Sequence, residues 1–183
     1  MSDPELLLRS ARGDRTAFEL LYERHKDAVY RFAFALTRSE ADAQDVVQES
    51  FLTLNRKAAE FDSTRAQLRT WLLGIARNLA YRRPGIRDSG EEPDPQTPDP
   101  VPGIEAALLR NEIAEAVRLA VIALPGPQRE AIVLFEFEGL SLAETAAVLG
   151  VAPNAIKARL HRGRACLKAS LPLLRIHQES RNI

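Results

Sequence analysis

Apolar residues recur every three to four positions along most of this chain, which is the period of an amphipathic α-helix. The alternation of apolar and polar residues that marks a half-buried strand is absent, and Ala, Leu, Arg and Glu dominate the sequence. We therefore predict an all-α protein. The segments predicted as helices are 5–11, 16–36, 41–57, 67–83, 104–123, 128–137, 141–149 and 153–170.

The last two predicted helices carry clear boundary signals. Ser141 and Glu144 have the spacing of a capping box, in which each side chain binds the other residue's backbone amide. Gly150 follows the first of these helices, and Pro153 suits the first turn of the second. Two short helices joined by a glycine turn predict a helix-turn-helix.

A proline-rich acidic segment divides the chain. Residues 84–103 hold six of the 11 prolines, five acidic residues and a single arginine. Proline removes helical hydrogen bonds, and the segment has almost nothing apolar to bury. We expect two small helical domains, 1–83 and 104–176, joined by a flexible linker at 84–103.

The net charge is zero, because 25 Lys and Arg balance 25 Asp and Glu, so any nucleic-acid binding must come from local clusters. The second helix of the helix-turn-helix is such a cluster, since it carries cations and no acid from 153 to 168. Guanidinium and ammonium groups neutralise phosphates and reach base edges. The candidate DNA contacts on this helix are Asn154, Lys157, Arg159, His161, Arg162 and Arg164.

A second acid-free basic stretch lies at 65–83, with five arginines and interleaved aromatic and amide side chains. Arginine and aromatic groups together suit unstacked single-stranded bases. From its spacing with Leu72 and Ile75, Trp71 is interpreted as a core residue, whereas Arg77 and Asn78 are expected to be exposed. The candidate residues are Arg65, Arg69, Arg77, Asn78, Tyr81 and Arg82.

The helix before this stretch has an acidic face. Asp42, Asp45, Gln48 and Glu49 repeat at helical spacing, while the apolar residues between them point the other way. Two interpretations stay open at this point, a solvated helix face and a docking surface for a basic partner.

Several classes of function are excluded. A lone Cys166 rules out a disulfide scaffold, and the three histidines do not have the spacing of a zinc site. There is no phosphate-binding glycine loop and no nucleophile elbow, so we expect neither an enzyme nor a cofactor. The acidic N-terminus and the lack of a long apolar run predict a soluble cytoplasmic protein.

Taken in order, these motifs resemble the extracytoplasmic-function (ECF) sigma factors of bacterial RNA polymerase. The acidic run 42–51 and the segment 71–78 resemble the second sigma domain, and the segments 124–129, 138–144, 149–151 and 156–164 resemble the fourth. The resemblance covers nearly all of the chain outside the linker. It implies a transcription initiation factor that directs core RNA polymerase to a class of promoters.

The resemblance also implies partners for each surface. The face of Asp42, Asp45, Gln48 and Glu49 would dock on the β′ coiled coil, and the fourth domain would bind the β flap. The 65–83 region would read and melt the −10 element, with a flipped base near the loop 62–68, and the 157–164 helix would read the −35 element. The linker would pass near the active-site cleft and the RNA exit path. An anti-sigma factor would hold the protein inactive.

Two residues of the second helix of the helix-turn-helix depart from the family pattern. Ala155 and Ala158 stand where many members of the family have Thr and Ser, so two hydroxyl contacts to phosphate are missing.

The remaining alternatives are a stand-alone helix-turn-helix regulator with a helical sensor or dimerisation lobe, and a protein-binding adaptor. The acidic helix followed by an arginine-rich helix distinguishes a sigma factor from the first of these alternatives, and the two basic helices argue against the second.

Overall fold

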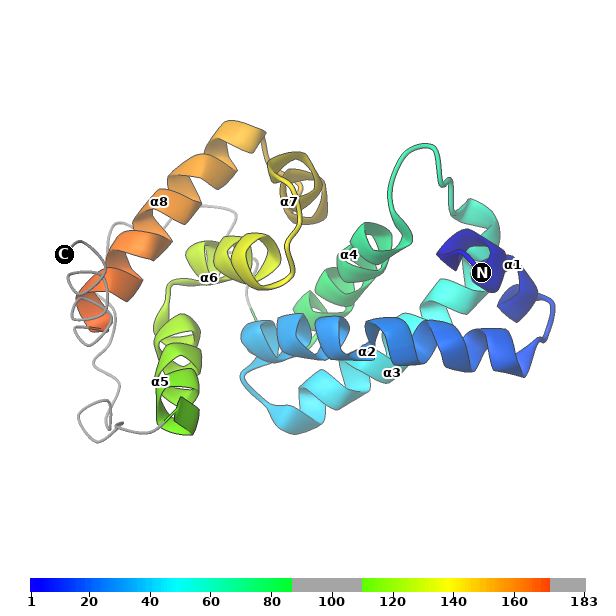
Figure 1. The fold of residues 1–183 in the computed structure, drawn as a ribbon, viewed down its shortest axis with the longest axis horizontal. Coiled ribbons are helices and arrows are strands. Elements are labelled where there is room, and N and C mark those ends of the chain that lie inside the picture. The colour runs from blue at the N-terminus through cyan, green and yellow to red at the C-terminus, as the bar shows by residue number, and fades with distance from the viewer. Residues whose placement is uncertain (87–109, 172–183) are drawn as a thin grey trace.

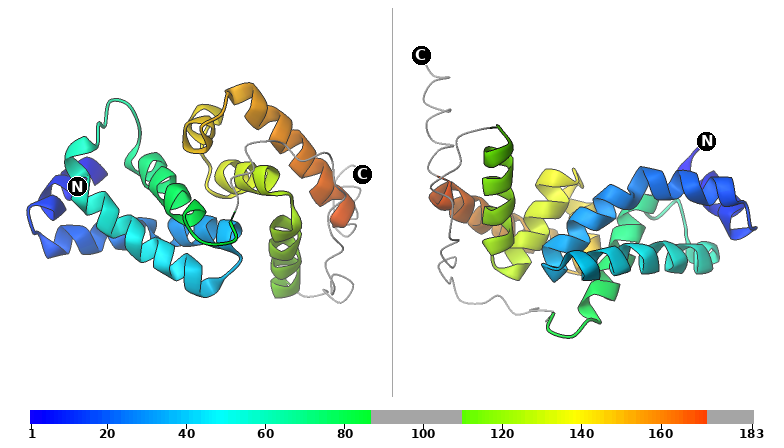
Figure 2. Two further views of the ribbon diagram at one scale, coloured as in Figure 1. Left: turned by 180° about the vertical axis from the view of Figure 1, so that it is seen from behind. Right: turned by 90° about the horizontal axis from the view of Figure 1, so that it is seen from below.

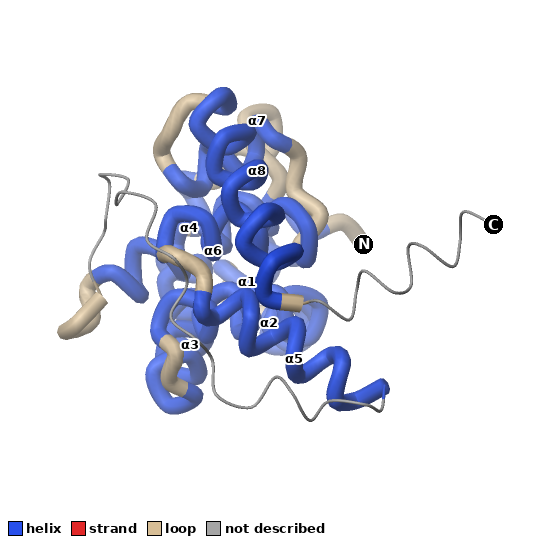
Figure 3. Tube along the Cα trace, turned by 90° about the vertical axis from the view of Figure 1, so that its left-hand side faces the viewer, coloured by secondary structure: helices blue, strands red, loops and turns tan. Residues whose placement is uncertain are grey.

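The computed structural model describes residues 1–86 and 110–171. All regular structure in these two ranges is helical, which confirms the all-α prediction (Figure 3). The N-terminal lobe, defined here as residues 1–86, holds α1 (Asp3–Ala11), α2 (Arg15–Thr37), α3 (Glu40–Arg56), the short η1 (Ala58–Glu60) and α4 (Leu68–Tyr81). The C-terminal lobe, residues 110–171, holds α5 (Arg110–Ala123), α6 (Gly126–Ile132), η3 (Val133–Phe137), α7 (Leu142–Leu149) and α8 (Pro153–Ser170).

Most of the predicted helices begin and end within a few residues of the observed ones, because local signals set their ends. Asp14 accepts a hydrogen bond from the Ala17 amide at the start of α2. The predicted capping box of α7 is present: the Ser141 amide donates to Glu144 at 2.9 Å, and the Glu144 amide donates to Ser141 at 3.2 Å. Gly150 ends α7 with a positive φ of 66°, a conformation that glycine adopts readily.

Two predicted helices differ from the observed ones. The helix expected over 67–83 ends at Tyr81, because Arg83 precedes Pro84 and cannot easily stay helical. The helix expected over 128–137 begins at Gly126 and changes into the π-helical turn η3, in which the Glu138 amide binds the Val133 carbonyl five residues back. Residues 87–103 of the predicted linker, and 104–109 of the helix after it, lie outside the described residues.

The two lobes lie side by side, with α1 at one end of the molecule and α5 and α8 at the other (Figures 1 and 2). The contacts between them join α4 to α7, and α2 to α6 and η3. Most buried apolar side chains form one contiguous cluster that runs from α1 through both lobes to Leu160 of α8, and Ala116, Ala120 and Leu171 form a second, small cluster in the C-terminal lobe. The lobes therefore share a packed interface in addition to their own cores.

Gly163 permits the close approach of α6 and α8. A Cβ at this position would lie 2.8 Å from Cγ1 of the buried Ile132, whereas a Cβ at Gly74 of α4 would meet nothing within 4 Å. We expect Gly163→Ala to lower the free energy of unfolding by about 1–3 kcal/mol, since overpacking outweighs the gain in helix propensity. Gly74→Ala is the matched control and should raise that free energy by up to about 1 kcal/mol. Urea unfolding measures both, and equal or greater stability of the Gly163 variant would contradict the packing argument.

Candidate nucleic-acid and protein interfaces

The acidic face lies on α3, which begins after Ser39, whose side chain accepts a hydrogen bond from the Asp42 amide. The buried Val46 and Val47 hold one side of the helix against the core, so the opposite side faces solvent. Asp45, Gln48 and Glu49 are exposed there, and Asp42 is half-buried. The structure brings all four predicted residues onto one surface.

Arg83 lies beside this face, which the sequence did not indicate. Its Nη1 is 3.1 Å from Asp42 and 3.4 Å from Asp45, and its Nη2 is 3.7 Å from Glu49. Arg83 belongs to the basic stretch 65–83, but in this arrangement its guanidinium lies against the carboxylates of α3. The chain turns at the end of α4 toward α3, and this packing carries Arg83 to the carboxylates. It leaves Asp45 and Glu49 largely accessible, with 64% and 54% of their side chains exposed.

The predicted single-strand-binding residues divide between two sides of α4 and the loop before it. Arg65, Asn78 and Arg82 are exposed. Asn78 and Arg82 line a groove of about 480 Å³ together with Trp71. Trp71 is only partly buried and packs against Phe61, with ring centroids 5.3 Å apart. This groove offers an aromatic face, an amide and a cation, which are the groups that hold an unstacked base.

Arg69, Arg77 and Tyr81 lie on the other side of α4 and contact the C-terminal lobe. Nε of Arg77 donates to Glu130 at 2.8 Å, and Tyr81 also donates to Glu130 through its hydroxyl. The Arg77 guanidinium carbon is 4.6 Å from the Tyr81 ring centroid. The prediction that Arg77 is exposed is wrong, because only 13% of its side chain is accessible.

A second carboxylate makes the matching contact further along the interface. Nη2 of Arg69 is 2.5 Å from Glu138, and Nε and Nη2 of Arg31 on α2 donate to the same carboxylate at 2.7 and 3.0 Å. Hydrogen bonding to Glu138 raises the pKa of Arg31 above its ordinary value. Thr70 adds a hydrogen bond to Glu144 at 3.2 Å. Sequence reasoning missed Arg31, Glu130 and Glu138, because their pairs join residues at least 49 positions apart.

The helix-turn-helix presents most of its predicted residues to solvent. On α8, Asn154, Lys157, His161 and Arg164 are exposed, and Arg162 is half-buried. Arg164 binds Glu136 of η3, with Nε at 2.7 Å from the carboxylate. These side chains give the outer surface of α8 the positive charge that phosphate binding requires.

The position of Arg159 contradicts its prediction as a DNA contact. Its side chain is buried, with the residue only 5% exposed, and its Nε has no hydrogen-bond partner among the described residues. It lies three residues after Ile156 and four before Gly163, so it falls on the buried stripe of α8. The helical spacing of Arg159 from the apolar residues of α8 could have predicted its burial, but its charge favoured the interpretation as a DNA contact.

Arg129 holds the junction between α5 and α6. Its Nη1 donates to the carbonyl oxygens of Ile122 and Leu124, both at 2.8 Å. Burial lowers the pKa of Arg129 to about 10, so the guanidinium keeps its charge at neutral pH. This contact fixes the loop that orients α6 and, through it, Glu130.

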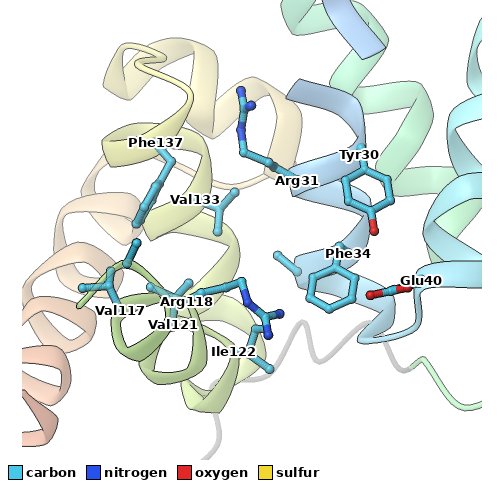
Figure 4. A pocket seen from close by; sticks show the side chains of 12 residues that line it. Tyr30, Arg31, Phe34, Glu40, Val117, Arg118, Val121, Ile122, Val133 and Phe137 are labelled. Carbon is cyan, nitrogen blue, oxygen red and sulfur yellow. The ribbon is translucent and has the colours of Figure 1, made fainter. Parts of the chain in front are cut away.

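An apolar groove of about 480 Å³ lies between the lobes (Figure 4). Tyr30, Phe34 and Glu40 form one wall, and residues of α5 and η3 form the other, including Val121 and the half-exposed Phe137. Because each lobe supplies one wall, the groove exists only while the lobes are packed together.

Two further features are absent from the described residues, 1–86 and 110–171. No group of three or more His, Cys, Asp or Glu side chains within them has an arrangement that would hold a metal ion. Among the helices of 1–86 and 110–171, none combines the length and apolar character needed to cross a bilayer.

The two lobes each match the model of a known protein family. Residues 21–88 match the family model of sigma-70 region 2, and residues 114–167 match that of sigma-70 region 4. The first match separates a sigma factor from a stand-alone regulator, since the two share a helix-turn-helix but not a region 2.

The relatives cover nearly the whole chain. The ECF RNA polymerase sigma factor SigM of Mycobacterium tuberculosis is 36% identical over 94% of this chain and 86% of its own length. The RNA polymerase sigma-H factor of Pseudomonas aeruginosa is 34% identical over 94% of this chain and 96% of its own.

Solved structures agree with these relatives. CnrH, in complex with the cytosolic domain of CnrY, is 31% identical, with a TM-score of 0.67 over 94% of this chain and 99% of that one. The sigma factor RpoE of Bartonella quintana, in complex with the anti-sigma factor NepR, is 28% identical, with a TM-score of 0.61 over 80% of this chain and 91% of that one. With both sigma regions matched in order and relatives above 30% identity along most of its length, this chain belongs to the ECF sigma factors of RNA polymerase.

Proposed function

We propose that this chain binds core RNA polymerase through the acidic face of α3 and directs it to promoters through α4 and α8. The observation that carries the proposal is the combination, within one ECF sigma chain, of an accessible carboxylate face and a cationic helix-turn-helix. Neither surface alone distinguishes a sigma factor from another DNA-binding protein. This function requires no catalysis by the chain and belongs in the cytoplasm, with the polymerase and the chromosome.

Each surface has a proposed partner of matching chemistry. Asp45, Gln48 and Glu49 present carboxylates and an amide, which suit a basic surface such as the β′ coiled coil. The groove beside Trp71, Asn78 and Arg82 suits the single strand exposed when the −10 element melts. The cations of α8 suit the −35 element in the major groove, and the C-terminal lobe is proposed to bind the β flap.

An anti-sigma factor is the proposed inhibitor. The support is that two structural relatives were solved with inhibitory or cytosolic partners, RpoE with the anti-sigma factor NepR and CnrH with the cytosolic domain of CnrY. The partner of this chain is proposed by class only.

Reconstitution tests the proposal directly. The purified chain is mixed with core RNA polymerase, and genomic fragments are selected for promoter-dependent transcription. We expect a stable complex with core polymerase and transcripts that begin at a shared pair of upstream elements. A chain that fails to bind core polymerase would overturn the proposal, and transcripts that do not depend on the chain would overturn its role in promoter choice.

A further inference from the structure

The apolar groove between α2, α5 and η3 is open to solvent in the part of the chain that the structure describes (Figure 4). Phe34 of α2 and Val121 of α5 line its opposite walls, and Phe137, which also lines it, keeps 51% of its surface accessible. Apolar surface is more stable when another apolar group removes it from water. The groove therefore suits an apolar segment of chain.

The described part of the C-terminal lobe ends beside this groove. Leu171, the last described residue, is buried against Ala116 and Ala120 of α5. Val117 of the same helix packs against these three residues and also lines the groove. The chain that follows Leu171 therefore starts at the border of the groove, on the helix that forms one of its walls.

The chain leaves α8 at this point and can reach the groove within a few residues. Pro172 follows Leu171, and the residue before a proline avoids helical backbone, which agrees with φ −120° and ψ 69° at Leu171. Successive residues of α5, such as Ala116 and Val117, are about 100° apart around the helix, an arc of about 10 Å on its surface. Three extended residues span about that distance, so residues 173–174 can reach the groove.

The composition of the next residues fits the groove. Residues 172–176 are Pro-Leu-Leu-Arg-Ile, four of them apolar, whereas 177–183 are polar except for the last residue. The apolar side chains match the apolar lining of the groove. Glu40 lines the wall that belongs to the N-terminal lobe, and Arg175 brings the matching positive charge.

We infer that residues 172–176, which lie outside the described residues, fold back over α5 and fill the groove between the lobes. The segment then contacts α2 of one lobe and α5 and η3 of the other, and any partner protein that binds in this groove has to displace it first. Asp45, Trp71 and Lys157, which belong to the three surfaces of the proposed function, do not line this groove. The inference is therefore independent of polymerase and DNA binding.

Hydroxyl-radical footprinting of the purified 183-residue chain, which reports how accessible each side chain is, tests this inference without polymerase or DNA. Leu173 and Leu174 should be oxidised about three- to tenfold more slowly than in a synthetic peptide of residues 171–183, since a pocket removes about 70–90% of the surface of what it binds. Equal rates in the chain and in the peptide would overturn the inference.

A variant of the segment tests the groove from the other direction. In Leu173→Asp with Leu174→Asp, Phe137 should be oxidised about threefold faster than in the wild type, because the groove that it lines is uncovered. Ser180→Asp with Asn182→Asp is the matched control, because it adds the same charge further along the chain. If Phe137 reacts equally fast in both double variants, the segment does not cover the groove.

A variant of the groove gives the reciprocal test. Phe137→Asp places a carboxylate in the apolar groove, so Leu173 and Leu174 should be oxidised at the rate measured for the peptide. Leu8→Asp is its control, since Leu8 of α1 is exposed to a similar extent, 55%, and lies outside the groove, so the rates of both leucines should stay at the wild-type value. Circular dichroism checks that each variant is folded.

The same measurements distinguish other occupants of the groove. Protection of Leu173 and Leu174 that disappears on dilution would place the segment in the groove of a second copy and overturn the inference. Protection of Phe137 that persists when both leucines are replaced would mean that another segment covers the groove, which also overturns it. Failure of the chain to bind core polymerase overturns the proposed function alone.

Discussion

Asp45→Lys combined with Glu49→Lys is expected to lower the affinity for core RNA polymerase by about 100-fold or more, because charge reversal replaces two attractions with two repulsions. A 100-fold loss corresponds to about 2.8 kcal/mol of binding free energy, at roughly 1.4 kcal/mol per tenfold change. Both side chains are more than half exposed, so the effect on binding should exceed the effect on folding. The measurement is fluorescence anisotropy of the labelled chain titrated with core polymerase, at two salt concentrations.

The neighbouring α2 supplies a matched control for this variant. Glu19 and Glu23 lie in the same lobe with 59% and 63% of their side chains exposed, and they stand outside the acidic face. Glu19→Lys with Glu23→Lys makes the same change in charge and should leave polymerase affinity within about twofold of the wild type. If both double variants bind equally well, the acidic face of α3 is not the docking surface.

The second large effect is expected on α8. Lys157→Ala with Arg164→Ala should weaken binding of the assembled holoenzyme to promoter DNA by about 10- to 100-fold at moderate salt, because both cations are exposed and belong to the proposed −35 contacts. The plot of log affinity against log salt should lose about 0.9 in slope for each phosphate contact removed. A filter-binding titration at four salt concentrations measures both quantities.

Two further variants on the same helix sharpen this test. Lys168→Ala removes an exposed cation near the end of α8, outside the proposed contacts, and should leave the salt slope unchanged. Arg159→Ala should change thermal stability instead of the salt slope, because Arg159 is buried. A salt slope that falls for Arg159→Ala as much as for Lys157→Ala would show that α8 binds DNA in another conformation.

The net charge of zero conceals surfaces of opposite charge. Carboxylates gather on α3, and cations gather on α4 and α8. In the structure some of these charges satisfy one another, since Arg83 lies against the acidic face and Glu138 binds Arg31 and Arg69. The same charges are therefore available either to the protein itself or to its partners.

The sequence by itself determined the helices, because their signals are local. The period of the apolar residues, the Ser141–Glu144 capping box and Gly150 act within one or two turns, so they can be recognised without the fold. It also determined the class of each surface, since Asp45 and Glu49, like Lys157 and His161, lie opposite the apolar side of their own helix.

Only the tertiary structure decided which cations are available for DNA. Arg77 and Lys157 have the same kind of neighbours along the chain, yet Arg77 is half-buried against Glu130 and Lys157 is exposed. Arg83 points to α3 because of how α3 and α4 pack, and Glu138 reaches Arg31 across 107 residues. The helical period shows on which side of its helix a residue lies. It does not show which other element packs against that side, because this depends on contacts between residues distant in the sequence that form only when the lobes pack.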